Sequence, residues 1–383
     1  MRRRPLVAGS VAVVVAVSAS TLAAGLDRFG GARVSVPAER VQPDPSTGPT
    51  SADRRLRPAF TVTDAALQPK SVVASGNGLF FTQNMMYRHN VSVFDRSGAK
   101  VATIPDTVDL AAFGLPGGVV RGSPVEAAFT PDGRYVYVSN YKMYGPGFRS
   151  DASDDCGRGN WDDSYVYKID VATFGIVAVI PTGAVPKHLA VSPDGSRVVV
   201  SNWCGFDVTV IDATTDAPVA RVDVGRHPRG VAITHDSRYA FVTVMGEARI
   251  DVVDLLELRV VHSIRDAAGT TPRHLLLSND GRFLFVSNNR MNSVRKIDLA
   301  TDRVVGLART GTETRTMVLA DDNASLFVVN YRDGTVSKVR TADMAVLQTV
   351  YSGVHPVGVT YGAQSRQVWV SNYVGNLRVF VDG

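Results

Sequence analysis

Basic side chains recur at one position along this chain, immediately after a proline or a residue that takes its place. Five of the seven positions are cationic, namely Lys70, Lys187, Arg229, Arg273 and Arg315, and the other two are Val125 and Val357. The position that follows is mostly small or polar, with Ser71, Glu126, His188, Gly230, His274, Thr316 and Gly358. Lysine and arginine bind phosphate and carboxylate groups through charge-assisted hydrogen bonds. These residue types predict a site for an anion.

Aromatic residues recur at a second position, directly after an asparagine of the repeating pattern. They are Tyr141, Trp203, Tyr331 and Tyr373. Cations and flat rings around one concave mouth suit a phosphate, a carboxylate, a sugar acid or a single-stranded nucleic-acid segment whose bases stack. A structural role is the alternative, because the basic residues could pair with carboxylates and the rings could cap gaps between neighbouring sheets.

An enzymatic role would use a smaller set of residues. Glu126, His188 and His274 are the acid/base candidates, and Arg229, Arg273 and Arg315 could hold an oxyanion or a carboxylate. Gly-x-Ser-x-Gly, His-Glu-x-x-His and phosphate-cradling motifs are absent from the sequence. The aspartates between Asp151 and Asp163 do not follow the spacing of a calcium-binding EF-hand loop. We therefore assign no catalytic residue outside this enzymatic alternative and predict neither a metal nor a cofactor.

The elements that position these residues form a repeat. Each copy has a proline, an alternating apolar run, a Ser-Pro-Asp-Gly-like turn, a second run that ends in Ser-Asn, and a third run that ends near Asp. The proline-like positions are Pro69, Pro124, Pro186, Pro228, Pro272, Thr314 and Pro356. The asparagine-like positions are Asn84, Asn140, Asn202, Val244, Asn288, Asn330 and Asn372. Both series give seven copies.

Seven such copies predict an all-β fold, a seven-bladed β-propeller of four-stranded antiparallel blades. Period-2 alternation indicates short strands, and one small sheet cannot bury both of its faces unless it packs between neighbours in a ring. The last copy ends after its third strand, Leu377 to Val381. The segment Phe60 to Thr63 has the pattern of the missing strand, so we expect the N-terminal strand to close the ring.

The strand that ends at each asparagine carries a recognisable motif. Tyr137-Val138-Ser139-Asn140, Val199-Val200-Ser201-Asn202, Phe285-Val286-Ser287-Asn288 and Trp369-Val370-Ser371-Asn372 resemble the repeat of the YVTN-type propellers. The resemblance covers about residues 58–383. It implies an exported, YncE-like propeller with a binding role, and nucleic acid is suggested for some relatives. The more distant lactonase-type propellers imply an enzymatic alternative.

Two insertions and both cysteines fall near the second blade. Extra residues follow Asn140 and also precede Pro124, so we expect two long loops side by side on one face. Cys156 lies in the first insertion and Cys204 lies in the neighbouring blade, two residues after Asn202. Exported proteins encounter oxidising conditions, so a Cys156–Cys204 disulfide is expected.

The N-terminus reads as a targeting segment. Arg2, Arg3 and Arg4 precede a short apolar stretch and small residues, which predicts a signal peptide over 1–24, with an uncleaved membrane anchor as the alternative. Residues 25–57 lack a sustained apolar period and are expected to form a flexible tether before a propeller at 58–383. Without the three arginines the formal charge of +5 falls to +2, which does not indicate a globally basic surface.

The composition agrees with a folded propeller. The 383 residues are 45% hydrophobic and 20% charged, which excludes collagen-like, coiled-coil and wholly disordered chains. Two cysteines cannot build a disulfide-dense scaffold or a four-thiolate zinc site. We predict an exported, monomeric propeller whose mouth binds an anionic small molecule or polymer. A lactonase-like hydrolase and a cell-envelope module that binds a protein partner are the alternatives.

Overall fold

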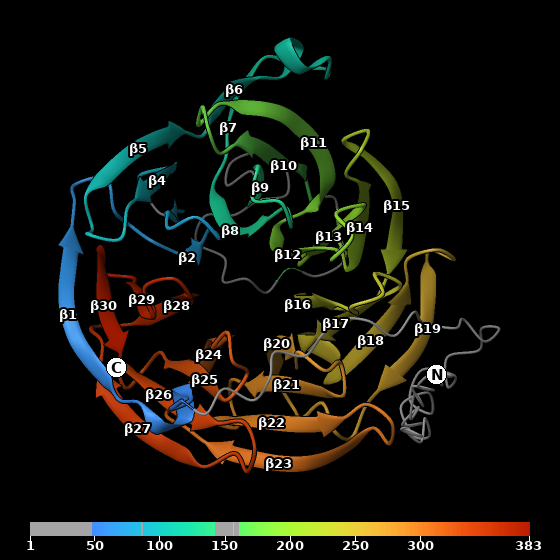
Figure 1. The fold of residues 1–383 in the computed structure, drawn as a ribbon. Helices are drawn as coiled ribbons and strands as arrows, with labels where there is room; N and C mark the ends of the chain where they lie inside the picture. Colours follow the sequence, from blue (N-terminus) through green and yellow to red (C-terminus); the bar gives the residue numbers. More distant parts are fainter. Residues whose placement is uncertain (1–47, 86, 142–155, 157–160) are drawn as a thin grey trace, which may run out of the picture.

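The computed structural model describes residues 48–85, 87–141, 156 and 161–383. The described strands form seven four-stranded antiparallel sheets arranged as the blades of a ring (Figure 1). The all-β class, the seven-bladed propeller and its four-stranded blades are therefore confirmed. Residues 1–47, which include the predicted signal peptide and most of the predicted tether, lie outside the described residues. In the described part of the chain, no helix is both long enough and apolar enough to span a bilayer.

Each blade runs from an inner strand at the axis to an outer strand at the rim. Blade 1 contains β2 (Ser71–Ala74), β3 (Phe80–Asn84), β4 (Asn90–Phe94) and β5 (Lys100–Pro105). Blade 2 contains β8 (Pro124–Phe129), β9 (Tyr135–Asn140), β10 (Asp163–Asp170) and β11 (Ile176–Ala184). Blade 3 contains β12 (Pro186–Val191), β13 (Arg197–Asn202), β14 (Asp207–Asp212) and β15 (Ala217–Asp223). Blade 4 contains β16 (Pro228–Ile233), β17 (Tyr239–Val244), β18 (Arg249–Asp254) and β19 (Arg259–Ile264).

The remaining three blades follow the same order. Blade 5 contains β20 (Pro272–Leu277), β21 (Phe283–Asn288), β22 (Ser293–Asp298) and β23 (Arg303–Arg309). Blade 6 contains β24 (Thr314–Leu319), β25 (Ser325–Asn330), β26 (Thr335–Arg340) and β27 (Val346–Tyr351). Blade 7 contains β28 (Pro356–Gly362), β29 (Gln367–Asn372), β30 (Asn376–Asp382) and, as its outer strand, β1 (Leu56–Thr63).

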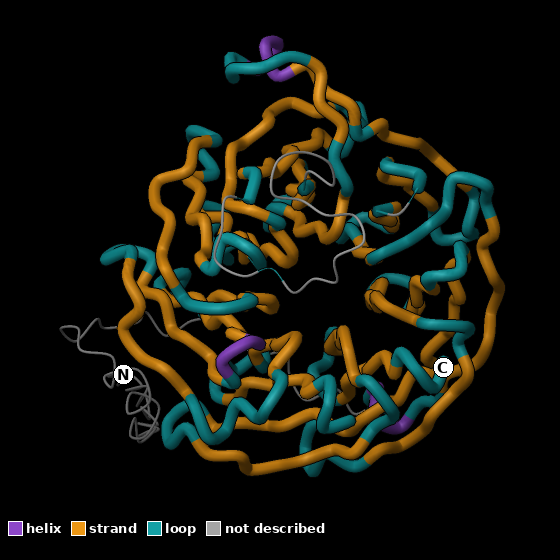
Figure 2. The backbone as a smooth tube through the Cα atoms, turned by 180° about the vertical axis from the view of Figure 1, so that it is seen from behind, coloured by secondary structure: helices purple, strands orange, loops and turns teal. Residues whose placement is uncertain are grey.

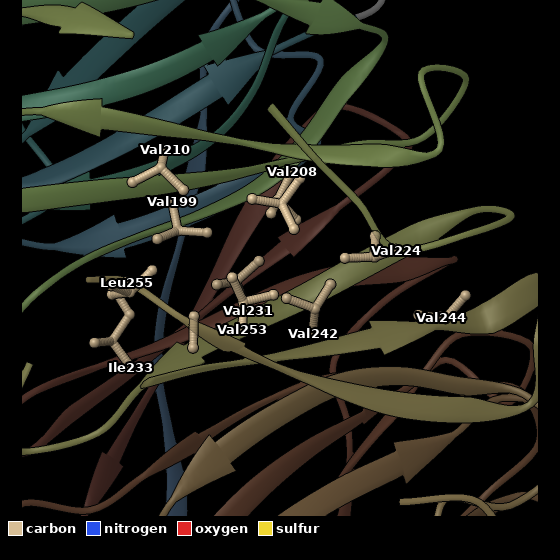
Figure 3. Close-up of a cluster of buried hydrophobic side chains, with 12 residues drawn as sticks. Val199, Val208, Val210, Val224, Val231, Ile233, Val242, Val244, Val253 and Leu255 are labelled. Atoms are coloured by element: carbon tan, nitrogen blue, oxygen red, sulfur yellow. The ribbon is translucent and has the colours of Figure 1, made fainter. Parts of the chain in front are cut away.

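The core lies between the faces of adjacent blades. Figure 3 shows one such layer, in which Val208 and Val210 of blade 3 face Val231 and Val242 of blade 4. Residues two apart on a strand share a face, which explains why alternating valines fill this layer. Burying one such side chain contributes about 1.5 to 3 kcal/mol. Similar clusters between the other blades hold the ring together by packing.

The ring is closed by the N-terminal strand, as predicted. β1 lies outside β30 and pairs with it antiparallel, with Leu56 opposite Asp382 and Val62 opposite Leu377 (Figure 1). The structured segment begins before the expected boundary at residue 58. A 3-10 helix, η2 (Ser51–Asp53), docks on blade 6, where the Ser51 amide and hydroxyl groups donate hydrogen bonds to the Asp322 carboxylate at 2.5 and 2.6 Å. Residues 51–57 of the predicted tether therefore belong to the propeller.

The insertion before Pro124 does not lie where we expected. It forms a hairpin of β6 (Thr107–Asp109) and β7 (Val119–Arg121), joined through the 3-10 helix η3 (Leu110–Phe113), and it projects from the outer rim in both views (Figures 1 and 2). Its apolar side chains pack against β10 and β11 of blade 2, which keeps it on the outside of the ring. Of the second insertion, residues 142–155 and 157–160 lie outside the described residues, so the expected pairing of two loops on one face receives no support.

Candidate functional site

The inner strands bring the predicted cations to the axis. Each inner strand contacts the inner strands of both neighbouring blades, so the seven positions after the proline-like residues share one ring. Lys187 and Arg229 are buried, at 2% and 7% exposure. Lys70, Arg273 and Arg315 are partly buried. The structure therefore brings the five predicted cations together around the axis of the ring, at the position of the predicted mouth.

In blade 3, a hydroxyl group on the second strand holds the backbone of two axial residues, one in the same blade and one in the next. The Ser201 Oγ atom accepts a hydrogen bond from the His188 amide at 3.1 Å and donates one to the Arg229 carbonyl of the next blade at 2.6 Å. A serine hydroxyl has one hydrogen and two lone pairs, so both bonds can form together. One side chain thus positions the histidine of its own blade and the cation of the next.

The same arrangement recurs at three more blade interfaces. The hydroxyl groups of Ser139, Thr243 and Ser287 donate to the carbonyl groups of Lys187, Arg273 and Arg315, at 3.0, 3.2 and 2.6 Å. They accept from the amides of Glu126, Gly230 and His274, at 3.2, 2.7 and 3.1 Å. We did not single out these hydroxyl residues from the sequence. Their signal was the Ser or Thr that precedes the asparagine-like position.

The positive charge of Arg229 shifts the pKa values of several other residues at the site. Burial and the positive charges of Arg229 and Lys187 hold the pKa of Lys70 well below its usual value. Burial raises the pKa of Glu126, and the charges of Arg229 and Lys70 oppose that rise. Neither Arg229 nor Glu126 forms an ion pair with any described residue, although both are buried. The Arg229 guanidinium and the Glu126 carboxyl group therefore lie at the same site without forming an ion pair with each other.

Two neutral histidines lie beside Arg229. The rings of His188 and His274 meet edge to face, with centroids 5.0 Å apart. The Val231 amide donates to His188 Nδ1 at 3.2 Å, whereas His274 Nδ1 is buried and has no hydrogen-bond partner among the described residues. Burial and the charge of Arg229 lower the pKa of His188 to about 3, and burial together with the charges of Arg229 and Arg273 lowers that of His274 well below its usual range.

These imidazoles are weak bases, which bears on the enzymatic alternative. A general base works best when its pKa lies near the working pH. At a pKa of about 3, His188 binds a proton poorly at neutral pH, although its neutral ring can still donate a hydrogen bond. The two histidines are brought together as the hydrolase hypothesis requires, but their basicity gives that hypothesis no support.

The predicted aromatic residues lie beside the cations. The Lys187 ammonium group is 4.9 Å from the Tyr141 ring centroid and 5.9 Å from that of Trp203. The Arg315 guanidinium carbon is 3.4 Å from the Tyr331 centroid, and the Lys70 ammonium group is 5.7 Å from that of Tyr373. Cation–π contacts of this kind contribute about 0.5 to 2 kcal/mol. Each of these four rings therefore lies within cation–π distance of a predicted cation.

The expected disulfide is present. Cys156 and Cys204 are bonded, with their Cα atoms 5.6 Å apart, and both are buried. Their neighbours include Tyr141 and Trp203, and the Cys156 carbonyl oxygen lies 3.2 Å from His227 Nε2. The disulfide therefore fixes residue 156 beside the aromatic residues at the mouth.

Two cavities among the described residues lie away from the ring axis. One, of about 310 Å³, lies between blades 2 and 3 and is lined by residues that include Tyr135, Tyr137 and Lys168. The other, of about 380 Å³, is lined by residues of blades 6 and 7 that include Tyr351 and Arg378. Neither cavity is lined by any of the five cations around the axis. Within the described ranges, no cluster of three or more His, Cys, Asp or Glu side chains could hold a metal ion.

Known proteins resemble this chain in fold more than in sequence. A chain of hydrazine synthase from Kuenenia stuttgartiensis superposes with a TM-score of 0.65 at 18% identity, over 83% of this chain and 96% of that one. Antigen Lp49 of Leptospira interrogans (serogroup Icterohaemorrhagiae, serovar copenhageni) is 23% identical over 147 residues, which are 36% of this chain. The chain spans about a third of that relative's length, 32%. No protein-family model matches the chain, so membership of the YVTN-type family is not confirmed. The structural match supports the fold, and the sheet topology makes the chain a seven-bladed β-propeller.

Proposed function

We propose that this protein is an exported propeller that binds an anionic ligand at its axial mouth. Buried Arg229, which has no ion-pair partner among the described residues, is the observation that carries the proposal. Removing a charge from water is costly unless an opposite charge compensates it. A bound anion would supply that compensation.

The balance of charges in the mouth supports an anion over a cation. Lys70, Lys187, Arg273 and Arg315 share the ring with Arg229. Glu126 is the one carboxylate at the two axial positions, and Glu313 pairs with Arg315 at 3.3 Å, so five cations face two carboxylates. The histidines add hydrogen-bonding groups without adding charge, because burial keeps them neutral. The formal charge of +5 falls to +2 without Arg2, Arg3 and Arg4 of the predicted signal segment, so the positive region is local.

Export is part of the proposal. A disulfide such as Cys156–Cys204 is typical of proteins that reach an oxidising compartment. The predicted signal segment over 1–24 supports the same placement. The alternative is a cell-envelope module that captures a protein partner through the insertion 141–164, most of which lies outside the described residues.

The test is anion binding by the full-length protein. Thermal unfolding and calorimetry are performed with inorganic phosphate, citrate and oligo(dT), at low and high NaCl. We expect at least one anion to raise Tm, to bind more weakly as salt rises, and to lose most of its affinity in Arg229→Gln. Arg303→Gln, which removes an exposed arginine from β23, is the matched control. The proposal fails if no anion binds, or if both variants lose affinity equally.

A further inference from the structure

The aromatic rings at the mouth offer little surface on which a base could stack. The Tyr331 ring stacks on His355, with centroids 4.5 Å apart, and also carries Arg315 at 3.4 Å. Two groups at these distances cannot occupy one face of the ring, so both faces of Tyr331 are covered. Trp203 stacks on His227 at 4.4 Å and is only 7% exposed.

The other two rings do not form a platform for a polymer. Tyr141 is 4% exposed, and its hydroxyl group contacts Met85 Sδ at 3.3 Å. Tyr373 is partly buried, with Lys70 5.7 Å from its centroid. Proteins that bind single strands without sequence preference stack successive bases on exposed rings. One partly buried tyrosine does not meet that requirement.

The hydrogen-bond donors reach the mouth from different directions. Arg229 lies on β16, His188 on β12 and Lys70 just before β2, so these donors come from three different blades. Because the Val231 amide donates to His188 Nδ1, the neutral ring carries its hydrogen on Nε2 and can donate from there. A carboxylate presents two oxygens in one plane, whereas a tetrahedral oxyanion presents oxygens in several directions.

We infer that the mouth binds a compact tetrahedral oxyanion, a phosphate or sulfate group, with Arg229 as its main anchor, and that it does not bind single-stranded nucleic acid. This inference rests on the proposed anion-binding function and narrows its ligand class. The group is recognised whether it is free or is the terminal group of a small molecule, because the donors surround the oxygens.

The experiment is calorimetric titration of the full-length protein with four probes at one ionic strength. They are inorganic phosphate, sulfate, acetate and oligo(dT). We expect phosphate or sulfate to bind about tenfold or more tightly than acetate, and oligo(dT) not to bind. Arg229→Gln should weaken phosphate or sulfate binding by about ten- to a hundredfold, the range for hydrogen bonds to a charged group. Arg303→Gln should bind like the wild type.

The outcomes separate this inference from the broader proposal. If oligo(dT) or acetate binds as tightly as phosphate and sulfate, the inference is overturned while anion binding stands. If no probe binds, both are overturned. Loss of the cooperative unfolding transition would show that Arg229→Gln does not fold. In that case the wild-type comparison of the four probes still decides the ligand class, and Arg273→Gln tests the role of the axial cations.

Discussion

The hydroxyl oxygen of Ser201 lies 2.6 Å from the carbonyl oxygen of Arg229, across the interface between blades 3 and 4. The Ser201 hydroxyl group also accepts a hydrogen bond from the His188 amide. It therefore connects blade 3 to blade 4 and holds the backbone of Arg229. A residue that contributes to the stability of the fold therefore also fixes the candidate site.

Replacing Ser201 with alanine should affect both properties. The free energy of unfolding should fall by about 1 to 3 kcal/mol, because the buried Arg229 carbonyl and His188 amide lose a partner. Anion affinity should fall as well, because the Arg229 backbone is no longer held. Urea denaturation and calorimetry measure the two effects. Ser201→Thr is the conservative control, since Thr243 makes the same bonds in blade 4. Equal losses in Ser201→Ala and Ser201→Thr would contradict this reasoning.

The ring and its closure could be predicted because both depend on repeated local patterns. Spaced prolines and asparagines mark where strands begin and end, and β1 shows the alternation that the last blade lacks. The asparagines also keep structural roles: Asn202 donates to Asp207 at 2.6 Å, and Asn330 donates to Thr335 at 3.0 Å. These are contacts within one repeat.

Contacts between repeats could not be predicted in the same way. The length of the insertion before Pro124 was visible, but its direction depends on Val108 and Leu110 packing against Tyr167 and Val179 of blade 2. The shared hydroxyl of Ser201 depends on the neighbouring blade and cannot be inferred from one repeat. The five cations were found because they share a repeat position, whereas their contacts with Tyr141 and Tyr331 were recognisable only in three dimensions.

A buried ion pair beside the closing strand joins blades 6 and 7 and should contribute strongly to stability. Lys338 of blade 6 and Asp382 of blade 7 form an ion pair in which neither side chain is exposed, and Arg54 bonds to Asp382 at 3.2 Å. Lys338→Ala leaves the carboxylate buried with fewer partners, so the free energy of unfolding should fall by about 3 to 5 kcal/mol.

An exposed pair near the same strand gives the control for this measurement. Lys100 and Asp64 form an ion pair at 2.8 Å, with the Lys100 side chain 40% exposed. Lys100→Ala should cost about 1 kcal/mol or less, because solvent screens the pair. Denaturant unfolding of both variants tests the difference. If the two variants were destabilised equally, burial of the Lys338–Asp382 pair would not be the cause of its effect.

The Cys156–Cys204 disulfide should stabilise the protein measurably. It joins residues 48 positions apart, and the loop-entropy relation gives about 4 kcal/mol for a closed loop of that size. Cys204→Ser should lower the free energy of unfolding by up to that amount. The wild type in reducing agent should unfold like the variant, which serves as the control. Mass spectrometry of a non-reduced digest should show peptides linked through residues 156 and 204, and free thiols at both positions would refute the pairing.

Asp106 should make the stability of the protein fall as pH rises. Asn140 Nδ2 donates to Asp106 Oδ1, while Asp106 Oδ2 and Asn140 Oδ1 are buried without partners among the described residues. One blade further on, the Thr182 hydroxyl donates to the matching Asn202 Oδ1 at 2.9 Å. A protonated Asp106 carboxyl would supply the donor that Thr182 supplies there. Burial raises the pKa of Asp106 well above its usual value, against the Gly122 amide and the charge of Arg121.

The sign of the pH effect follows from this shift. A carboxyl group whose pKa is higher in the folded state contributes its full stability below the unfolded value of about 3.9, and this is lost as pH rises through the folded pKa. The slope is at most about 1.4 kcal/mol per pH unit for one proton. Asp106→Asn keeps a hydrogen-bond donor and cannot titrate, so its advantage over the wild type should grow from pH 4 to pH 8. Asp109→Asn, at an exposed position of the same hairpin, is the control for the chemical change itself. Denaturant unfolding across the pH series decides the matter, and parallel curves for the wild type and Asp106→Asn would show that Asp106 is ionised in the folded protein.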